Sequence, residues 1–188
     1  MIIGINASSP VSSGSGPAPD LPTVIGEAFG GGWYIGDIDV AGSYYKIIVA
    51  PKSGEADGLR WKTASTSTAG TSSLADGFSN TAAMNSPEHE AASHCIAFSG
   101  GGYTDWYMPA LDELALFQAN LNPSTTLIDE FKTGGSDQLQ IGPYYWASTQ
   151  SSATSAWVKR FGSTFQYGSN KVNTIHPVRP VRRLAFTP

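Results

Sequence analysis

Two short runs rich in β-branched and aromatic residues mark the first folded elements of the chain. Residues 33–38 and 44–50 are dominated by Trp, Tyr, Ile and Val, and Gly42 with neighbouring aspartates lies between them. Runs of this composition separated by Gly and Asp predict an antiparallel hairpin. We therefore expect the folded part to begin near Ile25 with two paired strands, and Pro51 to end the second.

Helical signals follow in the middle of the chain, first over residues 79–98. Ser86 is a favoured N-cap, Pro87 suits the first position of a helix, and Gly100 can end one. We expect the first of two helices in this stretch.

The second helix is predicted over residues 111–121. Leu111 and Leu114 lie on one apolar stripe, and Pro123 ends the pattern. A further helical turn is predicted over residues 126–132.

The C-terminal part of the chain has a strand-like pattern from Tyr144 onward, with turn residues at 162–163 and 168–170. Pro180 interrupts the last apolar run, and its missing N–H favours an edge strand or a bulge there. Paired strands, two helices and a β-rich C-terminal half together predict an α+β fold.

The segment before the hairpin has a different composition. Residues 7–22 are mostly Ser, Gly and Pro, which cannot bury enough apolar surface to offset about 1–2 kcal/mol of backbone entropy per residue. We expect residues 1–24 to form an extended arm and residues 25–188 to form one domain. The arm begins with an apolar segment that is either a frayed terminus or a docking peptide for assembly, made of Met1, Ile2, Ile3 and Ile5.

The amount and distribution of charge argue against one class of partner, nucleic acids. Only 14% of the 188 residues are charged, and the formal net charge is −4. The basic residues are scattered except for a C-terminal group at 179–183, so no basic stripe is present to neutralise phosphates. We expect no nucleic-acid partner.

Cys95 is the only cysteine, so the chain can form neither an intrachain disulfide nor a four-cysteine zinc site. Its apolar neighbours predict a buried, unreactive thiol. The first residues lack the basic and long apolar segments of a signal peptide, and no stretch reaches the roughly eighteen apolar residues of a membrane span. We expect no export signal and no membrane insertion.

No catalytic constellation stands out. His89 and His94 flank a glutamate but lie five positions apart, which turns the imidazoles roughly 140° away from each other on a helix. Adjacent acidic pairs at 112–113 and 129–130 do not face each other on a helix, so solvated helix faces or charge–dipole contacts are expected. We expect no enzyme and no cofactor.

A metal site is also not expected. Asp37 and Asp39 share one face of a strand, and Asp105 lies in a Gly-rich turn. Calcium takes about six to eight oxygen ligands, usually from several carboxylates. Asp105 is expected instead to cap its own turn through backbone N–H groups.

Two aromatic motifs carry the strongest indication of function. The first is Gly102-Tyr103-Thr104-Asp105-Trp106-Tyr107-Met108-Pro109, followed by Leu111-Asp112-Glu113-Leu114. The second runs from Tyr145-Trp146-Ala147-Ser148-Thr149 through Trp157 and Phe161 to Val178-Arg179-Pro180-Val181-Arg182. Over about residues 25–184 the chain resembles the Lcl C-terminal domain family. The resemblance implies a C-type-lectin-like domain with two helices and antiparallel β-sheets, and binding in place of catalysis.

The resemblance also separates scaffold positions from contact positions. It implies core roles for the aromatic residues Trp106, Trp146, Trp157 and Phe161. The closing arginines, Arg179 and Arg182, are expected to pair with acidic residues or carbonyls. Lys159 departs from the family because it shares a strand face with Trp157, so either its ammonium reaches an edge or a bulge changes the register.

Ligand contacts in such folds come from residues between the scaffold positions. The candidate ligand-binding residues are Gln150, Ser152, Thr154, Lys159, Phe165, Gln166, Tyr167, Asn170, Lys171 and Asn173. Phe165 and Tyr167 alternate along a strand and so share a face. With amide and hydroxyl neighbours they form a suitable recognition surface, or else both rings pack into the core.

These observations favour a non-enzymatic component of a phage virion, made in the host cytoplasm. A tail-fibre or receptor-binding protein would recognise a host-surface glycan or protein, and a homo-oligomer, taken as a trimer, would raise avidity. The arm would join it to other virion subunits. The alternatives are a structural or decoration protein of the virion with no ligand of its own, and a bacterial surface adhesin.

Overall fold

The computed structural model describes residues 20–188 of the protein. The apolar segment with Met1, Ile2, Ile3 and Ile5, and most of the arm predicted over residues 1–24, lie outside the described residues. The division into arm and domain, and the assembly role of the arm, stay predictions.

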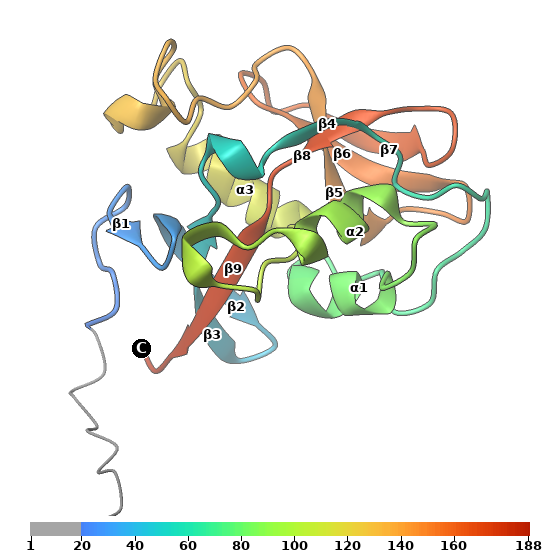
Figure 1. Ribbon diagram of the computed structural model, residues 1–188, viewed down its shortest axis with the longest axis horizontal. Coiled ribbons are helices and arrows are strands. Elements are labelled where there is room, and N and C mark those ends of the chain that lie inside the picture. The colour runs from blue at the N-terminus through green and yellow to red at the C-terminus, as the bar shows by residue number, and fades with distance from the viewer. Residues whose placement is uncertain (1–19) are drawn as a thin grey trace, which may run out of the picture.

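The hairpin predicted near the start of the domain is confirmed. The first strands are β1 (Ala28–Phe29), β2 (Gly32–Val40) and β3 (Ser43–Val49), and β2 pairs with β3 in antiparallel fashion. The last strand, β9 (Val181–Phe186), pairs with β3, which gives a four-stranded sheet in the order β1-β2-β3-β9. The beginning and end of the domain therefore meet in one sheet (Figure 1).

The other strands of the described residues form two smaller antiparallel sheets. One pairs β4 (Ala56–Leu59) with β8 (His176–Val178), and the other has the order β5-β6-β7, with β5 (Tyr144–Gln150), β6 (Ser155–Arg160) and β7 (Gln166–Asn170). Pro180 lies between β8 and β9, where the chain passes from one sheet to the next. It lies in a link and not in an edge strand or bulge, because a residue without an N–H fits where no ladder bond is donated. Its carbonyl still accepts from the N–H of Ala50.

The helix predicted over residues 79–98 is wrong as one element. Two helices occupy the region, α1 (Gly77–Ala83) and α2 (Glu90–Ala97), and with α3 (Leu111–Asn120) the described residues hold three α-helices instead of two. Pro87 has no N–H to bond the carbonyl four residues back, so a helix cannot run through it. Asp76 caps α1 by accepting from Ser79 N, whereas Ser86 caps no helix and its carbonyl accepts from His89 N.

Three 3-10 turns connect these elements: η1 (Lys52–Gly54), η2 (Gly100–Gly102) and η3 (Asp129–Phe131). The third falls within the helical turn predicted over residues 126–132. The predicted helix over residues 111–121 is confirmed by α3. In the described part of the chain, no helix has the length and apolar character that a membrane crossing requires.

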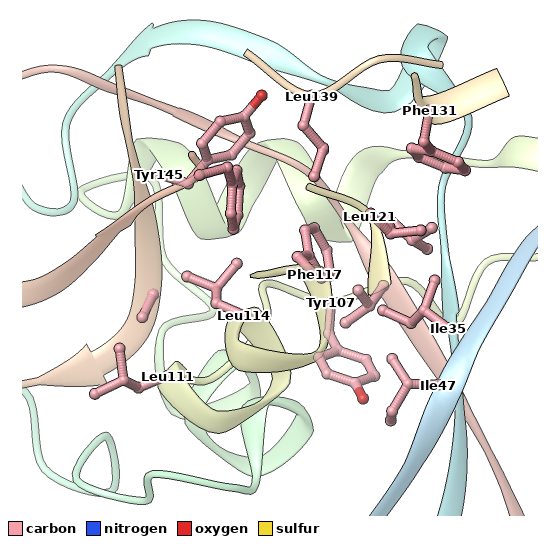
Figure 2. Close-up of a cluster of buried hydrophobic side chains, with 14 residues drawn as sticks. Ile35, Ile47, Tyr107, Leu111, Leu114, Phe117, Leu121, Phe131, Leu139 and Tyr145 are labelled. Carbon is pink, nitrogen blue, oxygen red and sulfur yellow. The ribbon is translucent and has the colours of Figure 1, made fainter. Parts of the chain in front are cut away.

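The α3 helix joins the two sides of the molecule. It contacts β2 on one side and β5 and β6 on the other. Figure 2 shows Leu114 and Phe117 of α3 between Tyr145 and the pair Ile35 and Ile47. All five side chains are fully buried, so the central core links the N-terminal sheet to the C-terminal one.

The scaffold role predicted for the aromatic residues is supported by their burial. Trp106, Trp146 and Phe161 have at most 2% of their surface exposed, and Trp157 is half-buried against the central core. Trp61, which the motifs did not single out, is also fully buried, and its indole N–H donates to Ala147 O at 2.9 Å. Cys95 is fully buried, as predicted, and burial raises the pKa of its thiol.

Candidate ligand-binding site

The β5-β6-β7 sheet carries most of the candidate ligand-binding residues, and its register decides which of them share a face. Tyr144 on β5 lies opposite Arg160 on β6. The ladder continues past the start of β7, because Arg160 N donates to Phe165 O at 3.1 Å. Directly opposed residues of an antiparallel pair project to the same side, so Tyr144, Arg160 and Phe165 form one row across the sheet.

A second row lies beside the first on the same side of the sheet. Trp146 lies opposite Val158, and Val158 lies opposite Tyr167. Trp146 and Val158 are fully buried, whereas Tyr167 at the edge is 40% exposed. Phe165 is 66% exposed, so neither ring belongs to the core and the core alternative for the two rings is wrong. The solvent-facing part of the two rows consists of the half-buried Tyr144 and Arg160 and the exposed Phe165 and Tyr167, here called the aromatic face.

Ring contacts hold the aromatic face in place. Tyr144 and Tyr167 make an edge-to-face contact, with ring centroids 4.9 Å apart and an interplanar angle of 83°. Tyr144 also contacts His176, which packs on Trp146 with centroids 4.6 Å apart. Tyr144 and Tyr167 are therefore supported by a chain of aromatic contacts that ends in the core.

His176 takes part in this support as a neutral ring. Its Nε2 lies 3.0 Å from Ser169 Oγ, and burial lowers its pKa to about 4. The imidazole is thus uncharged at neutral pH and packs between tyrosine and tryptophan as an aromatic ring.

Lys159 and Gln166 lie on the opposite face of the sheet from Phe165 and Tyr167. They are direct cross-strand partners, and Lys159 Nζ donates to Gln166 Oε1 at 3.2 Å. Lys159 is only 7% exposed, and burial lowers its pKa although the carboxylate of Asp112 acts in the other direction. The candidate residues of β6 and β7 are therefore divided between two faces. The ammonium of Lys159 is held by an amide in the sheet and does not extend as a free contact.

Lys171 was expected to contact ligand, but its side chain is fully buried. Its ammonium donates to Gln150 Oε1 at 2.5 Å and to Ala153 O at 3.1 Å, and lies 4.5 Å from the ring centre of Trp61. A third bond, to Thr66 O at 3.3 Å, joins it to the loop before α1. A charged head group in an apolar site needs such partners, so Lys171 holds loops together and presents nothing to solvent. Burial, with the nearby charge of Lys62, lowers its pKa to about 8.

Gln150 belongs to the same internal group. Its Oε1 accepts from Lys171 and from the backbone N–H of Thr68 at 2.8 Å, and its side chain is half-buried. The sequence marked these two residues correctly as lying between scaffold positions. It could not show that the polar atoms of both turn inward.

The remaining candidates lie in two exposed turns. Ser152 Oγ accepts from Thr154 N and Ser155 N, at 3.3 and 3.1 Å. Asn170 Oδ1 accepts from Val172 N and Asn173 N, at 3.0 and 2.9 Å. Ser152, Thr154 and Asn173 are exposed. Their side chains shape turns that leave hydroxyl and amide groups near the edge strand β7.

Two members of the aromatic face were missed by the sequence analysis. Tyr144 precedes Trp146 by two positions, so strand alternation could have placed it on the same face. Arg160 had no such signal, because its neighbours Lys159 and Phe161 point to the other face and only the pairing with Tyr144 identifies its side.

Other polar groups that the sequence singled out have structural roles. Asp105 does not cap its own turn but pairs with Arg182, with Oδ1 and Oδ2 at 2.8 and 2.9 Å from Nε and Nη2. His89 Nδ1 lies 3.1 Å from Trp61 O and His94 Nε2 lies 2.8 Å from Gly54 O, so the two rings contact different segments. Among residues 20–188 no three His, Cys, Asp or Glu side chains gather as metal ligands would.

The closing arginines are paired, as expected. Arg179 Nη1 lies 3.0 Å from Glu55 Oε2, and its Nε donates to Ala50 O at 2.9 Å. Arg182 also donates to Gly30 O at 3.1 Å. Both guanidinium groups therefore connect segments that are far apart in the sequence.

Comparison with known proteins gives a fold relative and a family. No curated protein matches the chain. A solved structure of a fimbrial protein from Bacteroides ovatus has a similar fold, with a TM-score of 0.50 and 13% sequence identity. The match covers 72% of this chain and 35% of that one, so this chain spans about a third of its structural relative. The family model of the Lcl C-terminal domain matches residues 53–182, and the chain belongs to that family.

Proposed function

We propose that this protein is a non-enzymatic binding domain that recognises a cell-surface ligand through the aromatic face. The observation that carries the proposal is the exposure of Phe165 and Tyr167 on a sheet whose other aromatic rings are buried or half-buried. Exposed rings that are held rigidly lose little entropy when a ligand packs on them. Turns at the other end of β6 and β7, with the exposed Ser152 and Asn173, supply further groups that can form hydrogen bonds.

Two findings support a role at a surface. The chain belongs to the Lcl C-terminal domain family, and its fold is similar to that of a protein described as fimbrial. We infer that the domain has the C-type-lectin-like arrangement, in which both ends of the chain meet in one sheet. In such an arrangement loops at the far side are free to contact a ligand.

In the finer form of the proposal the domain is a tail-fibre or receptor-binding component of a phage virion. Its ligand is a glycan or protein of the host surface. Several copies, taken as three, would raise avidity, because each additional contact then forms within one particle. The arm over residues 1–24 would join the domain to neighbouring virion subunits.

A bacterial surface adhesin is the second candidate, and the similarity to a fimbrial protein favours it. Both candidates use the same aromatic face. They differ in the particle that carries the domain and in the cells that it meets.

The test of the proposal is binding of the fluorescently labelled full chain to intact bacterial cells of several species and to cultured epithelial cells. We expect the double substitution Phe165→Ala with Tyr167→Ala to lower cell binding at least about tenfold, because it removes both exposed rings. Selective binding to bacteria would support the virion form, and binding to epithelial cells would support the adhesin form.

The matched control is Leu127→Ala, since Leu127 is 90% exposed and lies in a different part of the chain, between α3 and η3. It should bind cells as the unmodified protein does. Equal cell binding by the double variant and the unmodified protein would rule out the aromatic face as the recognition surface.

A further inference from the structure

Arg160 differs from the other arginines of the protein. All five arginines lie in the described part of the chain, and four of them pair with a carboxylate: Arg60 with Glu90, Arg179 with Glu55, Arg182 with Asp105, and Arg183 with Asp76. Arg160 forms no ion pair with any residue in 20–188. Its Nε donates to Ile141 O at 3.1 Å, and its terminal nitrogens donate to none of the described residues.

The position of this guanidinium group is set by the sheet. Arg160 is the direct partner of Tyr144, its guanidinium carbon lies 5.9 Å from the ring centre of Tyr144, and its backbone N–H bonds Phe165. The unpaired positive charge therefore belongs to the same row as two aromatic rings. The bond from Nε to Ile141 O restrains the group, so that less freedom is lost when its remaining N–H groups bind a partner.

These neighbours combine two kinds of recognition. A guanidinium fork binds a carboxylate through two parallel hydrogen bonds, and does so more strongly than it binds a neutral acceptor. Flat aromatic rings pack against the rows of C–H groups on one side of a pyranose. Phe165 and Tyr167 lie two positions apart on an extended chain, roughly 6.6 Å along the strand, so both rings reach one bound oligosaccharide.

We propose that the aromatic face binds an acidic saccharide, with the sugar carboxylate on Arg160 and a sugar ring on Phe165 and Tyr167. The inference rests on the proposed function, since it names the ligand class of the same surface.

The test compares saccharides that differ only in charge. Binding of the full chain is measured by biolayer interferometry to immobilised trigalacturonate and to its methyl ester, and likewise to sialyllactose and to lactose. We expect at least one acidic member to bind about tenfold or more tightly than its neutral counterpart, because a charge-assisted hydrogen bond is lost in the neutral one. The preference should weaken as salt is raised.

Substitutions separate the role of Arg160 from a general effect of charge. Arg160→Gln should reduce the preference for the acidic saccharide to about onefold. Lys132→Gln removes the same charge from an exposed side chain just after η3 and should leave the preference intact. Arg160→Lys, which keeps the charge without the fork, should recover part of the preference and shows that loss in Arg160→Gln is not misfolding.

Three outcomes would overturn the inference: equal binding to both members of both pairs, an equal loss in Arg160→Gln and Lys132→Gln, or binding of immobilised hexaglutamate in place of any saccharide. The last outcome would identify an acidic peptide as the ligand. If cells are bound through Phe165 and Tyr167 but no saccharide is, the proposed function stands and the saccharide inference fails. If cell binding also ignores these rings, both fail together.

Discussion

Glu113 is a carboxylic acid enclosed by the protein interior. The sequence predicted a solvated helix face or a charge–dipole contact at the helix start. The side chain lies in the first turn of α3 but is fully buried. It accepts from the Tyr107 hydroxyl at 2.6 Å and from Ala110 N at 2.7 Å. Burial raises its pKa to about 7, although these two bonds oppose the rise.

This shift predicts a pH dependence of stability. The folded state keeps a proton on Glu113 that the unfolded state releases above its ordinary pKa of 4.5, so the free energy of unfolding falls as pH rises from about 4.5 to about 7. The total fall from this group is on the order of 3 kcal/mol. Urea unfolding across this pH range should show the fall in the unmodified protein and a smaller one in Glu113→Gln.

Two comparisons keep this prediction specific. The lowered pKa of His176, about 4, has the opposite effect: it lowers the free energy of unfolding as pH falls below 6.5. This contribution is the same in the unmodified protein and in Glu113→Gln, so the difference between their two pH profiles reports on Glu113 alone. Glu27→Gln changes an exposed carboxylate and should follow the unmodified protein. Parallel pH profiles for Glu113→Gln and the unmodified protein would contradict the assigned proton.

At the scale of elements, two glycine-rich segments meet backbone to backbone. The turn between β1 and β2 contains Gly31, and η2 contains Gly101. A Cβ atom on Gly101 would lie 2.3 Å from Gly31 Cα, and Gly101 has a φ of +64°. The contact brings the start of the domain against the segment that leads into the aromatic motif at Trp106, so these glycines permit the close approach of two distant elements.

Substitution of these glycines tests the contact. Gly101→Ala should lower the free energy of unfolding by about 2 kcal/mol or more, since it adds a backbone clash to the strain of a positive φ. Gly102→Ala is the matched control, because Gly102 has a φ of +80° but nothing within 4 Å of an added Cβ. It should cost about 1 kcal/mol from backbone strain alone. Equal losses in the two variants, measured by urea unfolding, would show that the segments do not depend on close approach.

At the scale of the whole molecule, Arg179 connects four segments. Its side chain is fully buried between β8 and β9, and it bonds Ala50 after β3, Glu55 before β4, and the carbonyl of Asp137 at 3.1 Å. The Glu55 side chain is only 2% exposed. Such a pair is held in position by its neighbours, and removal of one member leaves a buried charge without its partner.

Arg179→Met should therefore destabilise the protein by about 3–5 kcal/mol. The double variant Arg179→Met with Glu55→Met should recover part of this loss, because it also removes the buried Glu55 carboxylate that lost its partner, while Asp137, the second carboxylate on Arg179, remains. Urea unfolding of both variants provides the measurement. A loss below about 1 kcal/mol in the single variant would mean that water or another group replaces the arginine.

Local sequence pattern determined much of this protein. The strand runs of residues 33–38 and 44–50 and the helix over 111–121 were predictable, because alternation and helical spacing act through near neighbours in the chain. The burial of Trp146 was predicted from the family resemblance. The prediction of one helix over residues 79–98 was wrong at Pro87, because a proline can start a helix but cannot lie in the interior of one. The family was also recognisable from its motifs, and the match over residues 53–182 confirms it.

Only the tertiary structure decided which polar side chains face solvent. Lys171 carries the same local pattern as an exposed residue, yet one carbonyl that holds its ammonium, that of Thr66, comes from a distant segment. Glu113 bonds near neighbours in the chain, but its full burial is not visible in the local pattern. Arg160 became part of the aromatic face through the register of three strands, and register depends on pairings between residues that are remote in the chain. The strands and helices of the scaffold are therefore determined largely by local residue spacing, whereas the candidate site depends on contacts that form when the sheets assemble.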